Sequence, residues 1–107
     1  MSGAWGDMGN LLKQAQKMQR ELDHAREEIK NSRVEASAGD GAVQVEFSGD
    51  GQVQSVRVRP ELLRAGDADH VQDLLLKALQ AGYAKAATLR EERLQRVTGG
   101  LNLPGIF

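Results

Sequence analysis

The chain has 107 residues, two histidines and no cysteine, and its formal net charge is −1. This length predicts a single domain over residues 1–107, and the lack of cysteine excludes a disulfide framework, a thiolate metal site and a cysteine nucleophile. No apolar run approaches the roughly 20 residues of a membrane span, and the N-terminus does not resemble a signal sequence, so we expect a cytoplasmic protein. A chain this short buries only a modest core, which favours self-association.

The charges are segregated along the chain. Residues 1–31 carry five basic and five acidic side chains, residues 32–73 carry four and eight, and residues 74–107 carry five and two. The C-terminal third is therefore basic although the whole chain is nearly neutral. Such segregation is compatible with binding to a polyanion, but two ordinary solvated helix faces would also produce it.

A heptad repeat of apolar residues runs from Met8 to Ile29. It consists of Met8, Leu11, Ala15, Met18, Leu22, Ala25 and Ile29. This period predicts a long helix, to about Asn31, whose narrow apolar seam must be covered by another helix. Residues 1–7 are predicted to be a flexible segment before it, with Asp7 as the N-cap. At 1.5 Å per residue the helix would be roughly 37 Å long, so part of it should project beyond so small a core.

After the first helix the apolar period changes to two. This alternation predicts three strands joined by two Gly-Asp-Gly turns, over residues 34–38, 43–47 and 56–58. Short turns between successive strands make an antiparallel meander with one apolar face, which a helix or a second sheet must cover. Val53 has the wrong parity for the third strand, and this predicts a β-bulge or a late strand start.

A short helical turn follows the third strand. Pro60 ends that strand and suits a first helical position, so a single turn is predicted to Arg64. Asp69 with Gln72 three residues later has the spacing of a capping box, which predicts the start of a second long helix.

The second long helix should run from about His70 to Val97. Its apolar first half is expected on the sheet, and its sparser, more basic second half beside the first helix. Gly82 in the middle costs about 1 kcal/mol against alanine, which a close helix crossing would explain. Gly99-Gly100 should stop the helix. Residues 99–107 then form an apolar tail that should dock on this protomer or on another.

Three segments of the chain match a known pattern. They are MGNLLKQAQKMQ at residues 8–19, PELL at residues 60–63 and GGLNLPGIF at residues 99–107. In this order they resemble the YbaB/EbfC family of bacterial nucleoid-associated proteins, and the first and last segments are specific. The resemblance implies an α+β fold of order α-β-β-β-α with a three-stranded antiparallel sheet. It also implies a homodimer whose long helices project as paired arms, and binding of duplex DNA at the nucleoid through those helices.

The candidate DNA contacts are basic residues of the two long helices. Lys13, Lys17 and Arg20 follow at spacings of four and three, so they share one face of the first helix. The second helix supplies a further set, Lys85, Arg90, Arg93 and Arg96. Phosphate contacts of this kind give affinity with little sequence information and weaken steeply with salt. Four carboxylates within residues 21–28 argue against phosphate contact at the distal end of the first helix.

The sequence gives little support for catalysis or metal binding. His24 and His70 are far apart in the chain, and no carboxylate stands in an apolar setting suited to acid–base work. The Gly-Asp-Gly motifs lack a following lysine or ligand series, so they are turns rather than phosphate or cation loops. We expect no enzyme, no cofactor, no metal ion and no small-molecule substrate.

Packing within the fold or the dimer is expected from seven apolar residues, Leu11, Met18, Leu22, Val45, Phe47, Val56 and Val58. A second class of function stays open beside DNA binding. In it the protein is an interaction or assembly module, and its helical arms or its apolar C-terminal tail bind a partner protein.

Overall fold

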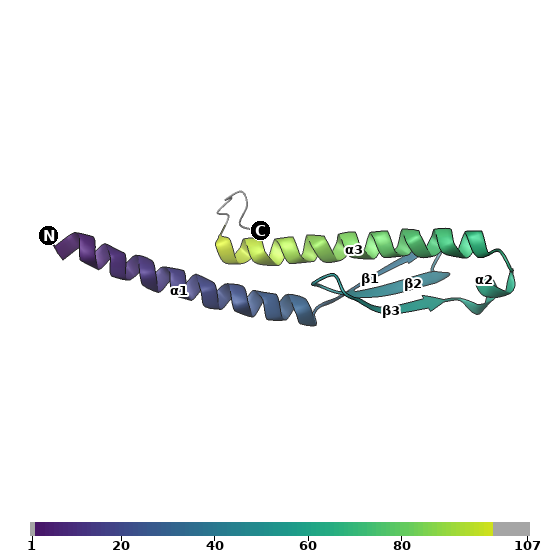
Figure 1. The fold of residues 1–107 in the computed structure, drawn as a ribbon, viewed down its shortest axis with the longest axis horizontal. Coiled ribbons are helices and arrows are strands. Elements are labelled where there is room, and N and C mark those ends of the chain that lie inside the picture. The colour runs from purple at the N-terminus through teal and green to yellow at the C-terminus, as the bar shows by residue number, and fades with distance from the viewer. Residues whose placement is uncertain (1, 100–107) are drawn as a thin grey trace.

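The structure is a computed structural model that describes residues 2–99. Its elements are α1 (Ser2–Asn31), β1 (Arg33–Ala38), β2 (Val43–Ser48), β3 (Val53–Val58), α2 (Pro60–Arg64) and α3 (Ala68–Thr98). This order confirms the α-β-β-β-α fold, including the short turn that became α2. The molecule is elongated, 79 × 23 × 16 Å, because both long helices extend past the same end of the sheet (Figure 1). The pairing of the arms in a homodimer stays a prediction.

The three strands form one antiparallel sheet in the order β1-β2-β3. The register shifts after Glu46, so that Val53 pairs with Phe47 and Gln54 is the extra residue. This bulge returns Val53 to the apolar face and confirms the prediction made from its parity. The first turn, residues 39–41, has positive φ at all three positions, which glycine and aspartate tolerate better than other residues.

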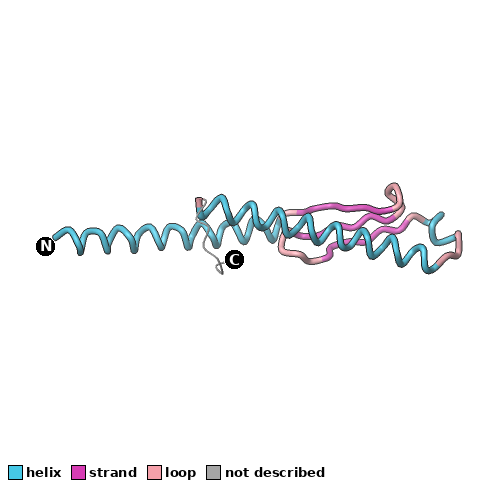
Figure 2. The backbone as a smooth tube through the Cα atoms, turned by 90° about the horizontal axis from the view of Figure 1, so that it is seen from above, coloured by secondary structure: helices cyan, strands magenta, loops and turns pink. Residues whose placement is uncertain are grey.

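The apolar face of the sheet is covered by α3 (Figure 2). The core consists of Val43, Val45, Phe47, Leu74, Ala78 and Ala86. Burying a large apolar side chain contributes about 1.5–3 kcal/mol, so this layer holds the fold together. The helix packs mainly on β1 and β2. As a result Val53 and Val56 of β3 remain 51% and 45% exposed, although Val56 was expected in the packing set. Val58 is half-buried.

Gly82 marks the closest approach of α3 to the sheet. A Cβ at this position would lie 2.5 Å from Cε1 of Phe47 and 3.2 Å from Cγ2 of Val45. The prediction of a close helix crossing was therefore wrong, since side chains of the sheet occupy the space that the glycine leaves. A helix that rests directly on large strand residues needs such a gap at its contact line.

The second half of α3 lies beside α1, as predicted. Ile29 at the end of the seam is buried, Met18 and Leu22 are half-buried, and Met8 and Leu11 are 61% and 64% exposed. The reason is that α1 continues past the end of α3 (Figure 1). Within one chain, then, α3 covers only the C-terminal half of the seam, and the prediction of packing at Leu11 is not met there.

Both long helices begin earlier than predicted. α1 is helical from Ser2, so Asp7 lies inside the helix and is not its N-cap. Once a helix is nucleated, each further residue adds a hydrogen bond, so the segment before the seam can continue the helix. α3 is capped by Asp67, whose side chain accepts a hydrogen bond of 3.1 Å from the backbone N–H of His70. Asp69, the predicted cap, instead lies in the first turn, where its charge favours the helix dipole.

The C-terminal end of α3 was predicted correctly. Gly99 is left-handed with φ of 61°, and its N–H donates to the carbonyl of Gln95 at 3.1 Å. Glycine is the usual residue at this position because it adopts the left-handed conformation without a Cβ clash. The predicted tail beyond it, residues 100–107, lies outside the described residues.

Replacing Gly82 with alanine should destabilise the protein by about 1–3 kcal/mol, because the new methyl overlaps the Phe47 ring. Helix propensity alone would favour alanine by about 1 kcal/mol. The free energy of unfolding is measured by urea titration followed by circular dichroism. Gly9→Ala is the matched control, since a Cβ there meets nothing within 4 Å. Equal stability of the two variants would contradict the close packing of α3 on the sheet.

Candidate nucleic-acid interface

The halves of α1 and α3 that extend past the sheet, which we call the arms, enclose a groove whose walls carry basic residues from both helices. α1 contributes Lys17 and Arg20, and α3 contributes Arg93 and Arg96 to a space of about 600 Å³. Val97 adds to the apolar part of its lining. The groove therefore brings together four of the seven basic residues predicted to contact DNA, from segments far apart in the sequence.

Helix geometry explains why these side chains converge. On α1, Lys17, Arg20 and His24 follow at spacings of three and four, so they lie on one face. On α3, Arg93 and Arg96 are three residues apart and share a face in the same way. All these residues line the one groove. The contact between the two helices therefore brings two Lys or Arg side chains from each helix to one groove.

Two carboxylates also line the groove. Glu28 lies between helices, with one oxygen 2.7 Å from Nε2 of His24 and the other 2.9 Å from Nη1 of Arg93. Glu21 lies 4.0 Å from the ammonium of Lys17. Such exposed pairs contribute at most about 1 kcal/mol each. Among the described residues, no carboxylate lies within ion-pair distance of Arg20.

Arg96 resembles Arg20 in lacking a nearby carboxylate. In the part of the chain that the structure describes, its guanidinium also has no carboxylate within 4.0 Å. These two arginines come from opposite walls of the groove. They are therefore the pair whose charge is least compensated by the protein itself.

Sequence reasoning missed two residues of the groove. His24 was considered only for catalysis, although its spacing from Arg20 already placed it on the basic face. Glu28 is one of the four carboxylates that led us to expect no phosphate contact in this part of α1. The structure instead places it inside the groove, bonded to Arg93. No feature of the sequence alone could reveal this contact, because it joins residues of α1 and α3.

The other three predicted residues lie outside the groove. Lys13 is exposed on α1, one turn further from the sheet than Lys17. Lys85 donates a 2.8 Å hydrogen bond to the backbone carbonyl of Glu35 in β1. Arg90 lies near the second turn, where a Cβ at Gly51 would be 3.8 Å from its Nη1. Lys85 and Arg90 thus belong to the sheet end of α3 and not to the arms.

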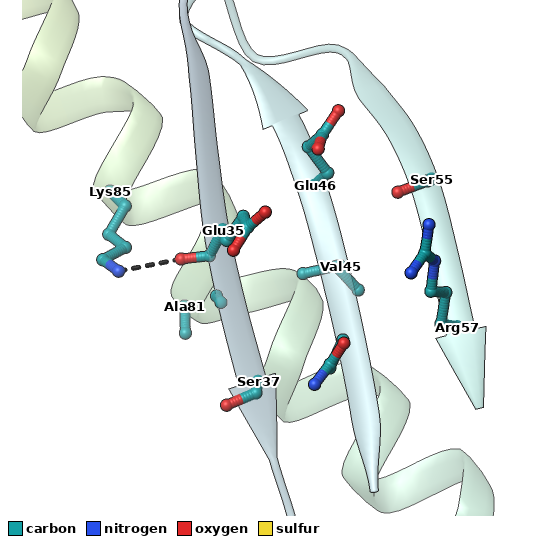
Figure 3. A pocket seen from close by; sticks show the side chains of 10 residues that line it. Glu35, Ser37, Val45, Glu46, Ser55, Arg57, Ala81 and Lys85 are labelled. Carbon is teal, nitrogen blue, oxygen red and sulfur yellow. Dashed lines mark hydrogen bonds between the residues drawn. The ribbon is translucent and has the colours of Figure 1, made fainter. Parts of the chain in front are cut away.

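A second hollow, of about 670 Å³, lies along the polar face and edge of the sheet (Figure 3). Glu35 and Glu46 line it together with Arg57 and Lys85, so its charge is mixed. Within residues 2–99 no group of three or more histidine, cysteine or acidic residues could hold a metal ion. Among the same residues no helix is long and apolar enough to cross a membrane. The groove between the arms has four Lys or Arg side chains against two carboxylates, whereas the hollow on the sheet has two against two, so the groove is the stronger candidate for a polyanion site.

A small α+β protein that projects two helices from its sheet and lines their groove with arginine and lysine has the build of a polyanion-binding protein. The model of the YbaB/EbfC DNA-binding family matches residues 4–101, and the chain belongs to this family. The match confirms the resemblance found in the three sequence segments.

Named relatives agree with this membership. Proteins named nucleoid-associated protein are similar to this chain in Ruminiclostridium cellulolyticum (37% identity over 98% of this chain and 92% of the relative), Acetivibrio thermocellus (41%, 98% and 94%) and Chloroflexus aggregans (43%, 91% and 95%). The crystal structure of an uncharacterized protein from Helicobacter pylori is also similar. Its TM-score is 0.72 at 27% identity, over 86% of this chain and 94% of that one.

Proposed function

We propose that this protein binds duplex DNA as a homodimer with low sequence specificity and organises the bacterial nucleoid, where it resides. Membership of a DNA-binding family supports DNA as the ligand. The observation that carries the choice of site is the convergence of Lys17, Arg20, Arg93 and Arg96 on one groove between the arms. Phosphate groups are the part of DNA that such side chains bind without reading sequence.

The chemistry of the groove suits phosphate groups. Guanidinium groups donate two parallel hydrogen bonds to a phosphate, and Arg20 and Arg96 have no carboxylate within ion-pair distance among the described residues. Both arginines are exposed on helices that project from the sheet, so a duplex can reach them. Lys13, further along the same face of α1, can extend the contact to another phosphate. A homodimer doubles every such contact.

The open side of the sheet supports a dimer surface. Val56 of β3 is 45% exposed, and Leu76 and Tyr83 of α3 are 55% and 58% exposed. Leu76 and Tyr83 are seven residues apart and so lie on one side of α3, and Tyr83 reaches the turn at Gly51 that leads into β3. This apolar patch adjoins the outer edge of β3, which offers unpaired backbone groups to a second copy.

The opposite edge of the sheet is less suited to pairing. At β1 the ammonium group of Lys85 already donates a hydrogen bond to the backbone carbonyl of Glu35. A lysine at a strand edge discourages another strand from adding there. We therefore assign the homodimer contact to the side of β3, with Val56, Leu76 and Tyr83 at its centre.

An interaction module is the second candidate function. It is favoured by the exposure of Met8 and Leu11 on α1, which offers an apolar helix face to a protein partner. In this alternative the charged groove keeps the arms in solution and does not bind DNA. The two candidates differ in whether the wild type binds duplex DNA at low salt.

Arg20→Glu/Arg96→Glu should weaken binding to duplex DNA by at least about tenfold, because it reverses the two least compensated charges of the groove. The slope of log K against log salt should become shallower by about 0.9 for each phosphate that the protein no longer neutralises. Mobility-shift titrations at two salt concentrations measure both effects. Arg64→Glu/Lys77→Glu changes the net charge equally but lies away from the arms, and it should bind like the wild type.

Two results of this experiment would count against the proposal. A wild type that does not bind DNA at low salt removes DNA as the ligand and favours the interaction module. Equal weakening by Arg64→Glu/Lys77→Glu removes the groove as the site while DNA binding stands.

Glu28→Gln should raise the affinity for duplex DNA by about 2- to 5-fold, because it removes a negative charge from the groove and releases Arg93. Glu27→Gln is the matched control, since it makes the same charge change one residue earlier and does not line the groove. The dissociation constants are measured by fluorescence anisotropy with labelled duplex. An equal effect of the two substitutions would show that only the net charge matters.

Val56→Arg should convert the dimer into a monomer near the chain mass of 11.6 kDa, since it places a charge at the centre of the proposed interface. Light scattering after size-exclusion chromatography measures the mass. Leu63→Arg is the control, because Leu63 on α2 is exposed to a similar extent, 57%, and lies outside the patch. A monomeric wild type, or a Val56→Arg protein that stays dimeric, would contradict the assignment.

A further inference from the structure

The tip of α1 carries an apolar stripe that the chain itself leaves uncovered except at Met18, which is half-buried. We call Met8, Leu11, Leu12, Ala15 and Met18 the tip stripe. Met8, Leu11 and Leu12 are 61%, 64% and 61% exposed, whereas Ile29 at the other end of the same seam is 2% exposed. The stripe continues the heptad repeat past the end of α3 without a break (Figure 1). An apolar seam of this kind is the surface by which one helix packs on another.

We propose that the tip stripe pairs with the tip stripe of a second copy of this chain, as an antiparallel coiled coil of α1 against α1. The position of α3 decides the direction. A parallel partner would follow the seam toward Ile29, where α3 already packs. An antiparallel partner runs in the opposite direction, away from the α3 and the sheet of this copy (Figure 1).

The residue sizes fit the antiparallel register. In such a pair each residue at heptad position a lies beside a residue at heptad position d of the other helix. Met8 of one copy then lies beside Met18 of the other, and Leu11 lies beside Ala15, in both directions. A large side chain meets a small one at the centre of the contact. In a parallel pair Ala15 would face Ala15 and leave a void.

The positions beside the centre of the stripe carry no charge. The residues that flank the centre of the stripe are Leu12 on one side and Gln14 on the other, and each would meet its own counterpart across the two-fold axis. Neither central pair brings like charges together, whereas further out Asp7 of one copy would face Glu21 of the other and weaken the contact. Lys13, Lys17 and Arg20 occupy the outer positions of the heptad, so pairing leaves the basic face of both copies open to phosphate.

The pairing has a consequence for assembly. It is a second two-fold contact, distinct from the β3 side at which we place the homodimer. Two different two-fold contacts on one chain link dimers into open rows or closed rings. A single stripe of this length is a weak contact, and the two arms of a dimer, or several dimers on one DNA, strengthen it through effective concentration.

The test uses cysteine cross-linking, because the chain has no cysteine of its own. Met8→Cys and Met18→Cys proteins are oxidised separately and as a mixture, with and without duplex DNA. Antiparallel pairing predicts at least about fivefold more disulfide-linked product in the mixture than in either protein alone. A parallel pair would give the reverse order, and this result would overturn the proposal.

A second pair of variants tests the stripe itself. Leu11→Gln/Leu12→Gln, added to both cysteine proteins, should abolish the cross-link, whereas Leu63→Gln should leave it unchanged because Leu63 is equally exposed but lies on α2. Disappearance of the cross-link with both changes would point to a general effect and overturn the proposal. So would a Met8→Cys protein that cross-links only to a cysteine introduced at position 103, which would assign the stripe to the chain's own C-terminal segment.

The proposal of a dimer at β3 and the proposal of tip pairing can be overturned independently. Val56→Arg added to the cysteine proteins removes the contact at β3, and the tip cross-link should persist in that background. Persistence in a monomeric background supports tip pairing independently of the dimer and of DNA binding. Its disappearance would show that the cross-link arises inside the β3 dimer and would overturn a separate contact at the tip.

Discussion

The packing of α3 on the sheet is the contact on which the rest of the structure depends. Leu74, Ala78, Gly82 and Ala86 follow at spacings of four and are all buried, so they form one contact line along the helix. A strand of six residues is about 20 Å long, whereas a helix of 31 residues is about 46 Å long. Half of α3 must therefore leave the sheet. That half packs against α1, and the groove between the arms follows from this mismatch in length.

The same geometry explains how a chain of net charge −1 can offer a site for a polyanion. The acidic excess lies in residues 32–73, which form the sheet, its turns, α2 and the start of α3, while the groove lies at the far half of the molecule. Screening limits the reach of exposed charges to about 8–10 Å in physiological salt, so the local composition of the groove matters more than the total charge. Glu28 tempers that local charge, because it binds His24 and Arg93 rather than leaving both free.

Periodicity predicted those features that a segment specifies by itself, and it failed where two segments meet. The heptads predicted α1, and the parity of Val53 predicted the bulge. Gly82 was assigned to a helix crossing because a glycine in a helix indicates a close neighbour but does not identify it. In the structure that neighbour is Phe47 of β2. For Lys85 the sequence shows only the charge, and its hydrogen bond to the carbonyl of Glu35 depends on the register of β1; its contact with DNA stays a prediction.

The free half of α1 combines two surfaces on one helix. Its apolar positions, Met8 and Leu11 among them, lie on one side, and Lys13 and Lys17 occupy outer positions of the same heptads. Helix geometry keeps these sets apart, so a protein partner on the seam and a phosphate on the basic side do not compete for space. An isolated helix of this length is only marginally stable in water, and either partner would stabilise it by binding the helical form. If both proposals hold, both partners favour the same ordered helix, so binding of one would lower the entropic cost of binding the other.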